Sequence, residues 1–233
     1  MFYYDSTILL VIPALVLSIY AQYKVNSAYK KYSAIRNAKG YTGADVARQL
    51  LLASRINDVS VEPIQGNLTD HYDPRSKTLR LSEGVYNSQS LAAVGIAAHE
   101  TGHAIQHNIG YGPLALRSGL VPVANLSSKL GIPLIFIGLL FASGTGGLGM
   151  LLVNAGILLY TVAVAFTLIT LPVEFNASGR AVELLSEYHF LNPDEITPAK
   201  KVLNAAALTY LAAALSAVLT LLRFVLIANG RRR

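Results

Sequence analysis

Residues 130–173, "LGIPLIFIGLLFASGTGGLGMLLVNAGILLYTVAVAFTLITLPV", contain no charged side chain. A helix crosses a bilayer with about 20 apolar residues, so this run is long enough for two crossings. The glycine-rich stretch "SGTGG" at 143–147 supplies a turn between them. We therefore expect a membrane hairpin over residues 120–171, with one span at 120–142 and the next at 148–171.

The beginning of this hairpin is open to two interpretations. Pro122, Asn125 and Lys129 interrupt the apolar pattern ahead of residue 130. Residues 114–129 either belong to the span or form an interfacial helix that leads into a short, tilted span. The sequence does not determine whether residues 120–130 are part of the membrane span or of an interfacial helix.

Two more apolar runs predict two more spans. Segment 1–23 contains the uncharged run 7–23, and "MFYYDS" at its start lacks the cationic region of a cleaved signal peptide. Residues 202–228 are rich in alanine and leucine and precede a basic tail at 229–233. The composition agrees, with 53% hydrophobic and 14% charged residues and a mean hydropathy of +0.44. We therefore expect a mainly α, multi-span helical protein embedded in a lipid bilayer.

The polar remainder, residues 24–119 and 172–201, is expected to fold together as a small α+β domain. Its first helix is predicted by "TGAD" at 42–45, a capping-box pattern ahead of "ADVARQLLLASR". An alternating stretch at 59–63 predicts a strand. Residues 67–82 predict a short antiparallel hairpin, because "DPRS" places Asp and Pro as a type I turn does.

Lysines and arginines gather near particular ends of the expected spans: Lys24, Lys30, Lys31, Arg36, Lys39, Arg117, Lys200 and Lys201. By the positive-inside rule, the polar domain is expected on the cytoplasmic side. With four spans both termini then lie outside, which leaves "RRR" at 231–233 on the disfavoured side. Because these charges flank apolar segments, the net charge of +6 is taken as a topology signal and no nucleic-acid partner is expected.

The stretch "IAAHETGHAIQH" at 96–107 contains the pattern H-E-x-x-H, on a helix expected to begin at the capping residues Asn87 and Ser88. Residues four apart share one helix face, so His99 and His103 point toward one place and can hold a zinc ion. Glu100 is then placed to act as general base on water at the metal. The alternative is a histidine-bearing amphipathic helix with no metal.

The chain has no cysteine, so further ligands must be His, Asp or Glu. His107 lies about 12 Å along the helix from His99, too far for the same metal, and it is interpreted as a neighbouring or surface residue. Glu174 is favoured as third ligand, because it is the first charge after the apolar run and two spans return it to the side of His103. The alternatives that remain are Glu183, Asp70 and His189.

Residues around the metal are harder to assign. Ser178 lies one helical turn after Glu174 and could hydrogen-bond a ligating histidine, with Asn176 as a weaker candidate. Several fixed donors could stabilise an oxyanion, and the sequence does not choose among them: His71, Tyr72, Tyr111, Arg180 and His189. Gly102, inside the motif, either lets substrate approach the metal or lets the helix of Glu174 pack closely.

The blocks "DHYDPRSKTLRLSEGVYNSQSLAAVGIAAHETGHAIQH" and "LPVEFNASGRA" resemble the YugP-like family of bacterial membrane zinc metallopeptidases. The resemblance covers nearly the whole chain and implies a zincin-like domain of gluzincin type in a bacterial cell membrane. It implies one zinc ion held by His99, His103 and Glu174, with Glu100 as catalytic base. The chain is more remotely similar to the HtpX and prenyl-protein protease group, which has Asp where this chain has Ser178.

Three functions are weighed on these grounds. The favoured one is a zinc endopeptidase at the cytoplasmic face that hydrolyses membrane-associated or unfolded proteins. A site-2-like intramembrane protease is disfavoured, because polar residues bound the motif helix too closely for a span. A non-catalytic, zinc-braced scaffold or chaperone-like module is disfavoured, because a structural site has no use for a base such as Glu100. The oligomeric state and the natural substrate are not predicted.

Overall fold

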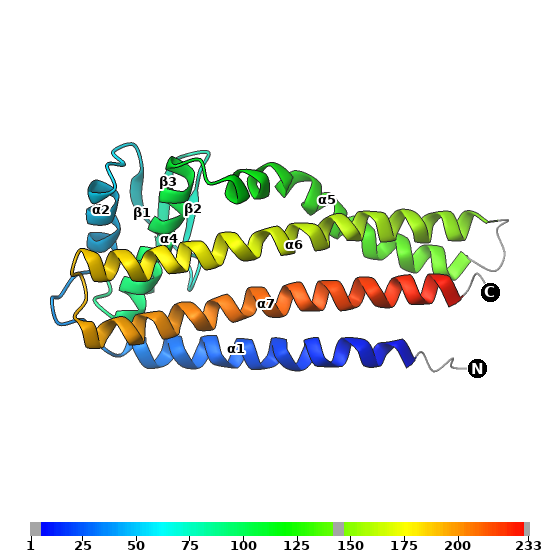
Figure 1. Cartoon of the computed structure of the whole chain (residues 1–233), viewed down its shortest axis with the longest axis horizontal. Helices are drawn as coiled ribbons and strands as arrows, with labels where there is room; N and C mark the ends of the chain where they lie inside the picture. The colour runs from blue at the N-terminus through cyan, green and yellow to red at the C-terminus, as the bar shows by residue number, and fades with distance from the viewer. Residues whose placement is uncertain (1–5, 142–146, 231–233) are drawn as a thin grey trace. The chain divides into compact units, whose positions relative to one another are not determined.

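The computed structural model of the chain describes residues 6–141 and 147–230. Within them the protein is mainly helical with one small sheet, which confirms the predicted fold class (Figure 1). The elements follow one another as η1 (Ser6–Val11), α1 (Ile12–Ser33), α2 (Gly43–Ala53), β1 (Ser60–Ile64), β2 (His71–Asp73), β3 (Thr78–Ser82), α3 (Glu83–Tyr86), α4 (Leu91–Asn108), α5 (Gly112–Phe141), α6 (Leu148–Glu187) and α7 (Pro193–Gly230).

Four helical segments in the described ranges are long and apolar enough to cross a membrane, and they overlap all four predicted spans. They are Thr7–Ser33, Gly112–Phe141, Leu148–Glu187 and Pro193–Gly230. Each helix extends beyond the expected span, so α6 runs unbroken through the expected boundary at residue 171. Most of the expected turn at 143–147 and of the basic tail at 229–233, and the start of segment 1–23, lie outside the described residues.

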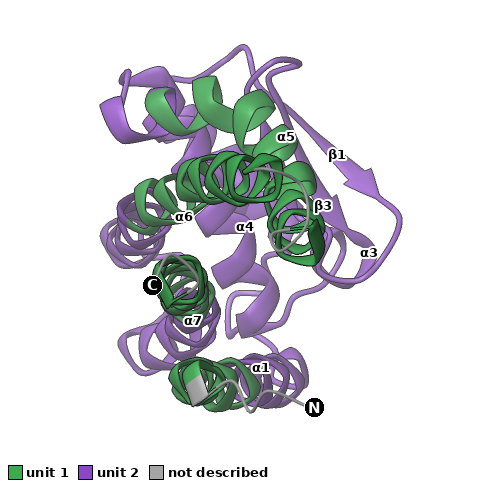
Figure 2. Ribbon diagram, turned by 90° about the vertical axis from the view of Figure 1, so that its right-hand side faces the viewer, with its two compact units in different colours: residues 1–20, 116–171, 210–233 green, residues 21–115, 172–209 purple. Residues whose placement is uncertain are grey.

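The chain divides into two compact units, coloured separately in Figure 2. Unit 1 comprises residues 1–20, 116–171 and 210–233, and unit 2 comprises residues 21–115 and 172–209. The helices α1, α5, α6 and α7 therefore each contribute one stretch to unit 1 and one to unit 2. Unit 2 contains the whole sheet and all of α2, α3 and α4.

Within unit 1, α5 and α6 pack with their backbones in close approach. A methyl group added at Gly138 would lie 2.6 Å from the carbonyl oxygen of Gly149, and one added at Gly156 would lie 2.7 Å from that of Gly131. Small residues that allow such approach are typical of helix pairs in membranes, where water does not drive association. These two contacts show that α5 and α6, which precede and follow the glycine-rich stretch in the sequence, pack closely against each other.

The helix α5 is continuous through the stretch that the sequence left undecided between span and interfacial helix. It is one helix from Gly112 to Phe141 with Pro122 and Pro133 inside it. It changes direction along its length (Figure 1). A proline inside a helix removes a backbone hydrogen bond and favours such a bend.

The sheet in unit 2 has the strand order β1-β3-β2. The predicted hairpin is confirmed, since β2 and β3 pair antiparallel with Tyr72 opposite Leu79. The third strand, β1, pairs with β3 in parallel, so the sheet is mixed and not antiparallel throughout. The central strand β3, "TLRLS", is largely buried, while the edge strands β1 and β2 are not.

The helix α4 is capped two to three residues later than the predicted capping residues Asn87 and Ser88. Residues Glu83–Tyr86 form the short helix α3, which was not expected, and Asn87 ends it. Ser90 caps α4 instead, with its hydroxyl accepting a hydrogen bond from the Ala93 amide at 3.1 Å. From there α4 runs through the core of unit 2, and most of its residues are buried.

The predicted capping box of α2 is present. The Thr42 hydroxyl accepts from the Asp45 amide at 3.1 Å, and the Asp45 carboxylate accepts from the Thr42 amide at 3.0 Å. The hydroxyl also donates to that carboxylate, which lowers the pKa of Asp45. These bonds satisfy amides that a helix N-terminus otherwise leaves unpaired.

We expect Thr42→Ala to destabilise unit 2 by about 0.5–2 kcal/mol, because it removes a helix cap. Thermal unfolding of the purified protein in detergent measures the effect, with Thr197→Ala at an exposed site on α7 as control. An unchanged midpoint for Thr42→Ala would show that the capping box contributes nothing to the stability of the fold.

Candidate metal centre

Two helices supply the candidate metal ligands. His99 and His103 lie one turn apart on α4, with ring centroids 4.8 Å apart and the ring planes nearly perpendicular at 84°. This is the arrangement that the spacing of four residues predicts, since both side chains leave the same helix face. His103 is buried and His99 is partly exposed, so the pair lies at the edge of the core.

Glu174 on α6 faces this pair. Its Oε2 atom lies 3.4 Å from His99 Nε2 and 3.6 Å from His103 Nε2. Ligands about 2.1 Å from a tetrahedral zinc ion lie about 3.4 Å from one another. The three groups offer ligand atoms within 4.8 Å of one another and have the donor chemistry of zinc sites, so these residues fit a zinc ion.

Gly102 brings the two helices together at this point. A methyl group built on Gly102 would lie 2.8 Å from the carbonyl oxygen and 3.2 Å from the Cα atom of Ala177, which are backbone atoms of α6. Ala177 lies three residues after Glu174 on the same helix. Of the two explanations that the sequence left for Gly102, the structure supports the close packing of the Glu174 helix.

Each histidine has a hydrogen-bond partner on the ring nitrogen that faces away from Glu174. Ser178 Oγ lies 3.0 Å from His99 Nδ1, and Gln106 Oε1 lies 3.0 Å from His103 Nδ1. When Nδ1 carries the proton and donates it to these oxygens, the lone pair of Nε2 is left for a metal. The partners thus orient both rings in the way that metal ligands require.

The proton on His103 is assigned by a chain of hydrogen bonds that begins at an arginine. Arg180 Nε can only donate, and it donates to Asn176 Oδ1 at 2.8 Å. The same oxygen accepts from Gln106 Nε2 at 2.9 Å, and Gln106 Nε2 also donates to the Val173 carbonyl at 2.8 Å. Gln106 must therefore present its oxygen to His103, whose Nδ1 is the donor.

Charged groups beside the ligands influence their protonation. Burial disfavours the imidazolium form of His103, but the carboxylates of Glu174 and Glu100 outweigh it and raise the pKa of His103. A proton and a metal ion compete for the same nitrogen, so metal binding at this site weakens as the pH falls. Burial, together with the negative charge of Glu100, raises the pKa of Asp70. Glu100 is itself buried, with 8% of its surface exposed.

The alternative ligands are not part of the cluster. Asp70 accepts hydrogen bonds from the amide and the hydroxyl of Ser82 at the end of β3. Glu183 and His189 are exposed on and just after the last turns of α6. Among the described residues, the cluster that could hold a metal consists of His99, His103 and Glu174.

The other candidate residues lie in different surroundings. Tyr72 OH and His107 Nδ1 are 2.8 Å apart and line a cavity of about 240 Å³ with Asp58 and Lys77. Burial, together with nearby carboxylates, raises the pKa of Tyr72 to about 12, so its hydroxyl stays protonated. His71 Nδ1 lies 2.8 Å from the Thr69 carbonyl, and the partly buried Tyr111 follows α4.

The sequence interpretation overlooked Gln106, which is fully buried and contacts His103 directly. Its position gives a usable signal, because it follows His103 by three residues and therefore lies on the same helix face. A glutamine on the buried side of an alanine-rich helix needs polar partners, and here they come from α6.

Two comparisons with known proteins give matches. A family model described as "Putative neutral zinc metallopeptidase" matches residues 7–229. The chain is 49% identical over 225 residues to the Bacillus subtilis (strain 168) protein named "Putative membrane protease YugP", covering 96% of this chain and 97% of the relative. No solved structure matches the chain significantly.

We expect Gly102→Ala to lower both stability and zinc content. The new methyl group would collide with the α6 backbone at Ala177, and overpacking of this kind costs about 1–3 kcal/mol. Gly179→Ala is the matched control, because a methyl group there meets nothing within 4 Å. Zinc per chain by mass spectrometry and the unfolding midpoint are measured on both. Full zinc content in Gly102→Ala would mean that the close approach does not set the ligand geometry.

We expect Gln106→Met to weaken zinc binding by about 10- to 100-fold, because His103 loses the acceptor for its Nδ1 proton. Competition with a chelator measures the affinity in folded, purified protein. Thr101→Val is the control, since Thr101 is buried on the same helix and its hydroxyl bonds only to the Ala97 carbonyl among the contacts described. Equal losses in the two variants would contradict a specific role for Gln106.

Proposed function

The chain belongs to this family of neutral zinc metallopeptidases, and from that premise we propose that it is a membrane-embedded, zinc-dependent endopeptidase. The observation that carries the proposal is the cluster of His99, His103 and Glu174, in which both distances from Glu174 to a histidine nitrogen match the edge of a zinc tetrahedron. Two histidines on one helix and a glutamate on another are a gluzincin-type ligand set. The pattern leaves a coordination position for substrate or water, as in catalytic zinc sites.

Zinc held by these residues supplies a Lewis acid that polarises water and the carbonyl of the peptide bond. Glu100 follows His99 directly on α4, so it is rotated away from the helix face that carries the two histidine ligands. Its carboxylate is still close enough to His103 to raise the pKa of that imidazole. We propose that Glu100 takes a proton from the attacking water and delivers it to the departing amine. A buried carboxylate suits this work, because little bulk water competes for its proton.

The remaining residues of the site position the ligands. Ser178 holds the His99 ring, and Gln106 holds the His103 ring. Arg180 and Asn176 hold Gln106 in the orientation that this requires. These contacts support one catalytic arrangement in which neither imidazole is free to rotate away from the metal.

We place the catalytic domain, residues 24–119 and 172–201, on the cytoplasmic side of the membrane. The lysines and arginines beside the span ends support this orientation. Substrates that are membrane-associated or unfolded proteins suit a site whose ligand helix α6 continues directly from an apolar span. The peptide would lie across the α4 and α6 contact, where His99 is partly exposed.

We expect Glu100→Gln to retain zinc and to cleave peptides about 10²–10⁴-fold more slowly, because the ligands remain while the base is lost. Cleavage of a fluorescently labelled unfolded protein in detergent, alongside zinc content, measures both. Glu183→Gln, an exposed glutamate on the same helix as Glu174, is the control and should cleave normally.

His103→Ala should lose zinc and activity together, because it removes a metal ligand. If Glu100→Gln cleaves as fast as the unaltered protein, the peptidase proposal fails. If the unaltered protein binds zinc but cleaves no peptide, and zinc removal unfolds unit 2, a zinc-braced scaffold is the better description.

A further inference from the structure

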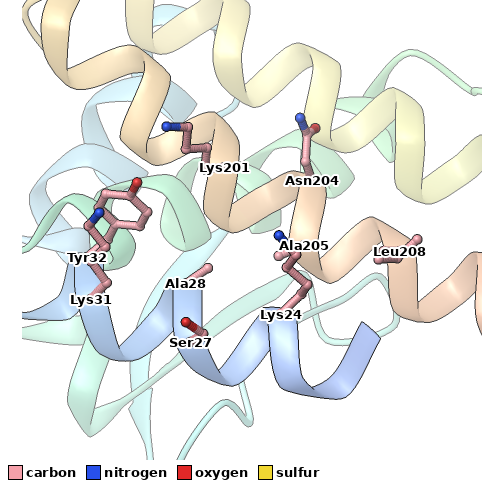
Figure 3. A pocket seen from close by; sticks show the side chains of 9 residues that line it. All are labelled: Lys24, Ser27, Ala28, Lys31, Tyr32, Lys201, Asn204, Ala205 and Leu208. Atoms are coloured by element: carbon pink, nitrogen blue, oxygen red, sulfur yellow. The ribbon is translucent and has the colours of Figure 1, made fainter. Parts of the chain in front are cut away.

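A second cavity lies in unit 2, away from the metal ligands. It has a volume of about 400 Å³, and its nine lining side chains come from α1 and α7 (Figure 3). They are Lys24, Ser27, Ala28, Lys31, Tyr32, Lys201, Asn204, Ala205 and Leu208. Three of them are lysines and none carries a carboxylate, so the cavity is cationic.

The three lysines that line this one space come from two helices that are far apart in the sequence. Lys24 and Lys31 lie two turns apart on α1, and Lys201 lies on α7. The Lys31 ammonium also lies over the Tyr32 ring, 5.4 Å from its centroid, which holds it near the cavity. A topology signal needs positive charge only somewhere near a span end, so it does not require that three lysines line one cavity.

The cavity lies where both helices change from apolar to charged sequence. On α1 the uncharged run 7–23 ends immediately before Lys24, and on α7 the apolar run 202–228 begins immediately after Lys201. In a membrane protein this change marks the level of the lipid headgroups. A ligand in the cavity would therefore be held at the membrane surface.

The lining is divided between polar and apolar groups. Ser27, Asn204 and the lysines offer hydrogen-bond donors suited to phosphate oxygens. Ala28, Ala205 and Leu208 offer apolar surface on the same two helices. A ligand that combines a phosphate with the beginning of a hydrocarbon chain uses both parts.

We propose that this cavity binds the phosphate headgroup of an anionic phospholipid, at the junction of α1 and α7. Basic cavities between membrane helices are the usual sites for such headgroups, because each lysine near the surface adds attraction for anionic lipid. The apolar residues and the level in the membrane favour a lipid over a free phosphate ion. The proposal does not depend on the peptidase activity.

The test compares two double variants with equal loss of charge. Lys31→Gln with Lys201→Gln removes two cavity lysines, and Lys30→Gln with Lys200→Gln removes their exposed sequence neighbours, which do not line the cavity. Full-length protein in neutral detergent is titrated with fluorescent phosphatidylglycerol. We expect the cavity variant to bind about tenfold more weakly than the unaltered protein and the neighbour variant to change by less than about twofold.

A steric variant tests the cavity without changing its charge. Ser27→Trp keeps all three lysines and fills part of the volume, so it should also weaken binding of phosphatidylglycerol. Circular dichroism and unfolding midpoints verify that each variant is folded. Ser27 is exposed, so this substitution does not disturb the buried core.

Four results would overturn the proposal. They are equal weakening in the two double variants, no effect of Ser27→Trp on binding in folded protein, equal binding of phosphatidylcholine, and displacement of the lipid by low-millimolar inorganic phosphate. Equal weakening in the two double variants, or no effect of Ser27→Trp, would indicate general attraction of the lipid to the protein surface. Equal binding of phosphatidylcholine would indicate a site that does not recognise charge. Displacement by inorganic phosphate would indicate a site for free phosphate. Selective loss in the cavity variant and in Ser27→Trp, with weak phosphatidylcholine binding, supports it.

Discussion

The close approach of α4 and α6 at Gly102 and Ala177 is the contact on which the metal centre depends. A side chain at position 102 would meet backbone atoms of α6 at 2.8–3.3 Å, and backbone cannot move aside as a flexible side chain can. The two histidines precede and follow Gly102 on α4, and Glu174 and Ser178 precede and follow Ala177 on α6. One backbone contact therefore sets the distances among three ligands and one of their hydrogen-bond partners.

The same interface contains polar groups whose burial is costly unless they are paired. Gln106 is fully buried and uses both ends of its amide, one toward His103 and the other toward α6. Arg180 reaches this network from the partly exposed side through Asn176. Because each partner has a fixed donor or acceptor role, the network allows one orientation of the His103 ring, and this rigidity is what a metal site requires.

Comparison of the two helices shows why some residues could be predicted and others could not. His99, Glu100 and His103 follow one another on a single helix, so a local pattern places them relative to one another. Glu174 is 71 residues further along, and it was favoured over Asp70, Glu183 and His189 only by its position after the apolar run. Gln106 was overlooked, although its spacing from His103 carries a signal, because its partners belong to α6. The strand β1 was expected, but its parallel pairing with β3 depends on which strand the core buries most.

The sequence by itself determined the helical class, the four apolar spans, the capping box of α2, the β2 and β3 hairpin and the pair of histidines. Each of these follows from periodicity, length or turn chemistry among neighbouring residues. These properties of a segment do not depend on where the segment lies in the fold. The tertiary structure alone decided the sheet order, the identity of the acid beside the histidines, the hydrogen bonds on their outer nitrogens and the cavity of three lysines. These depend on how closely helices from distant parts of the chain pack, and that distance is set by side-chain volumes on both partners at once.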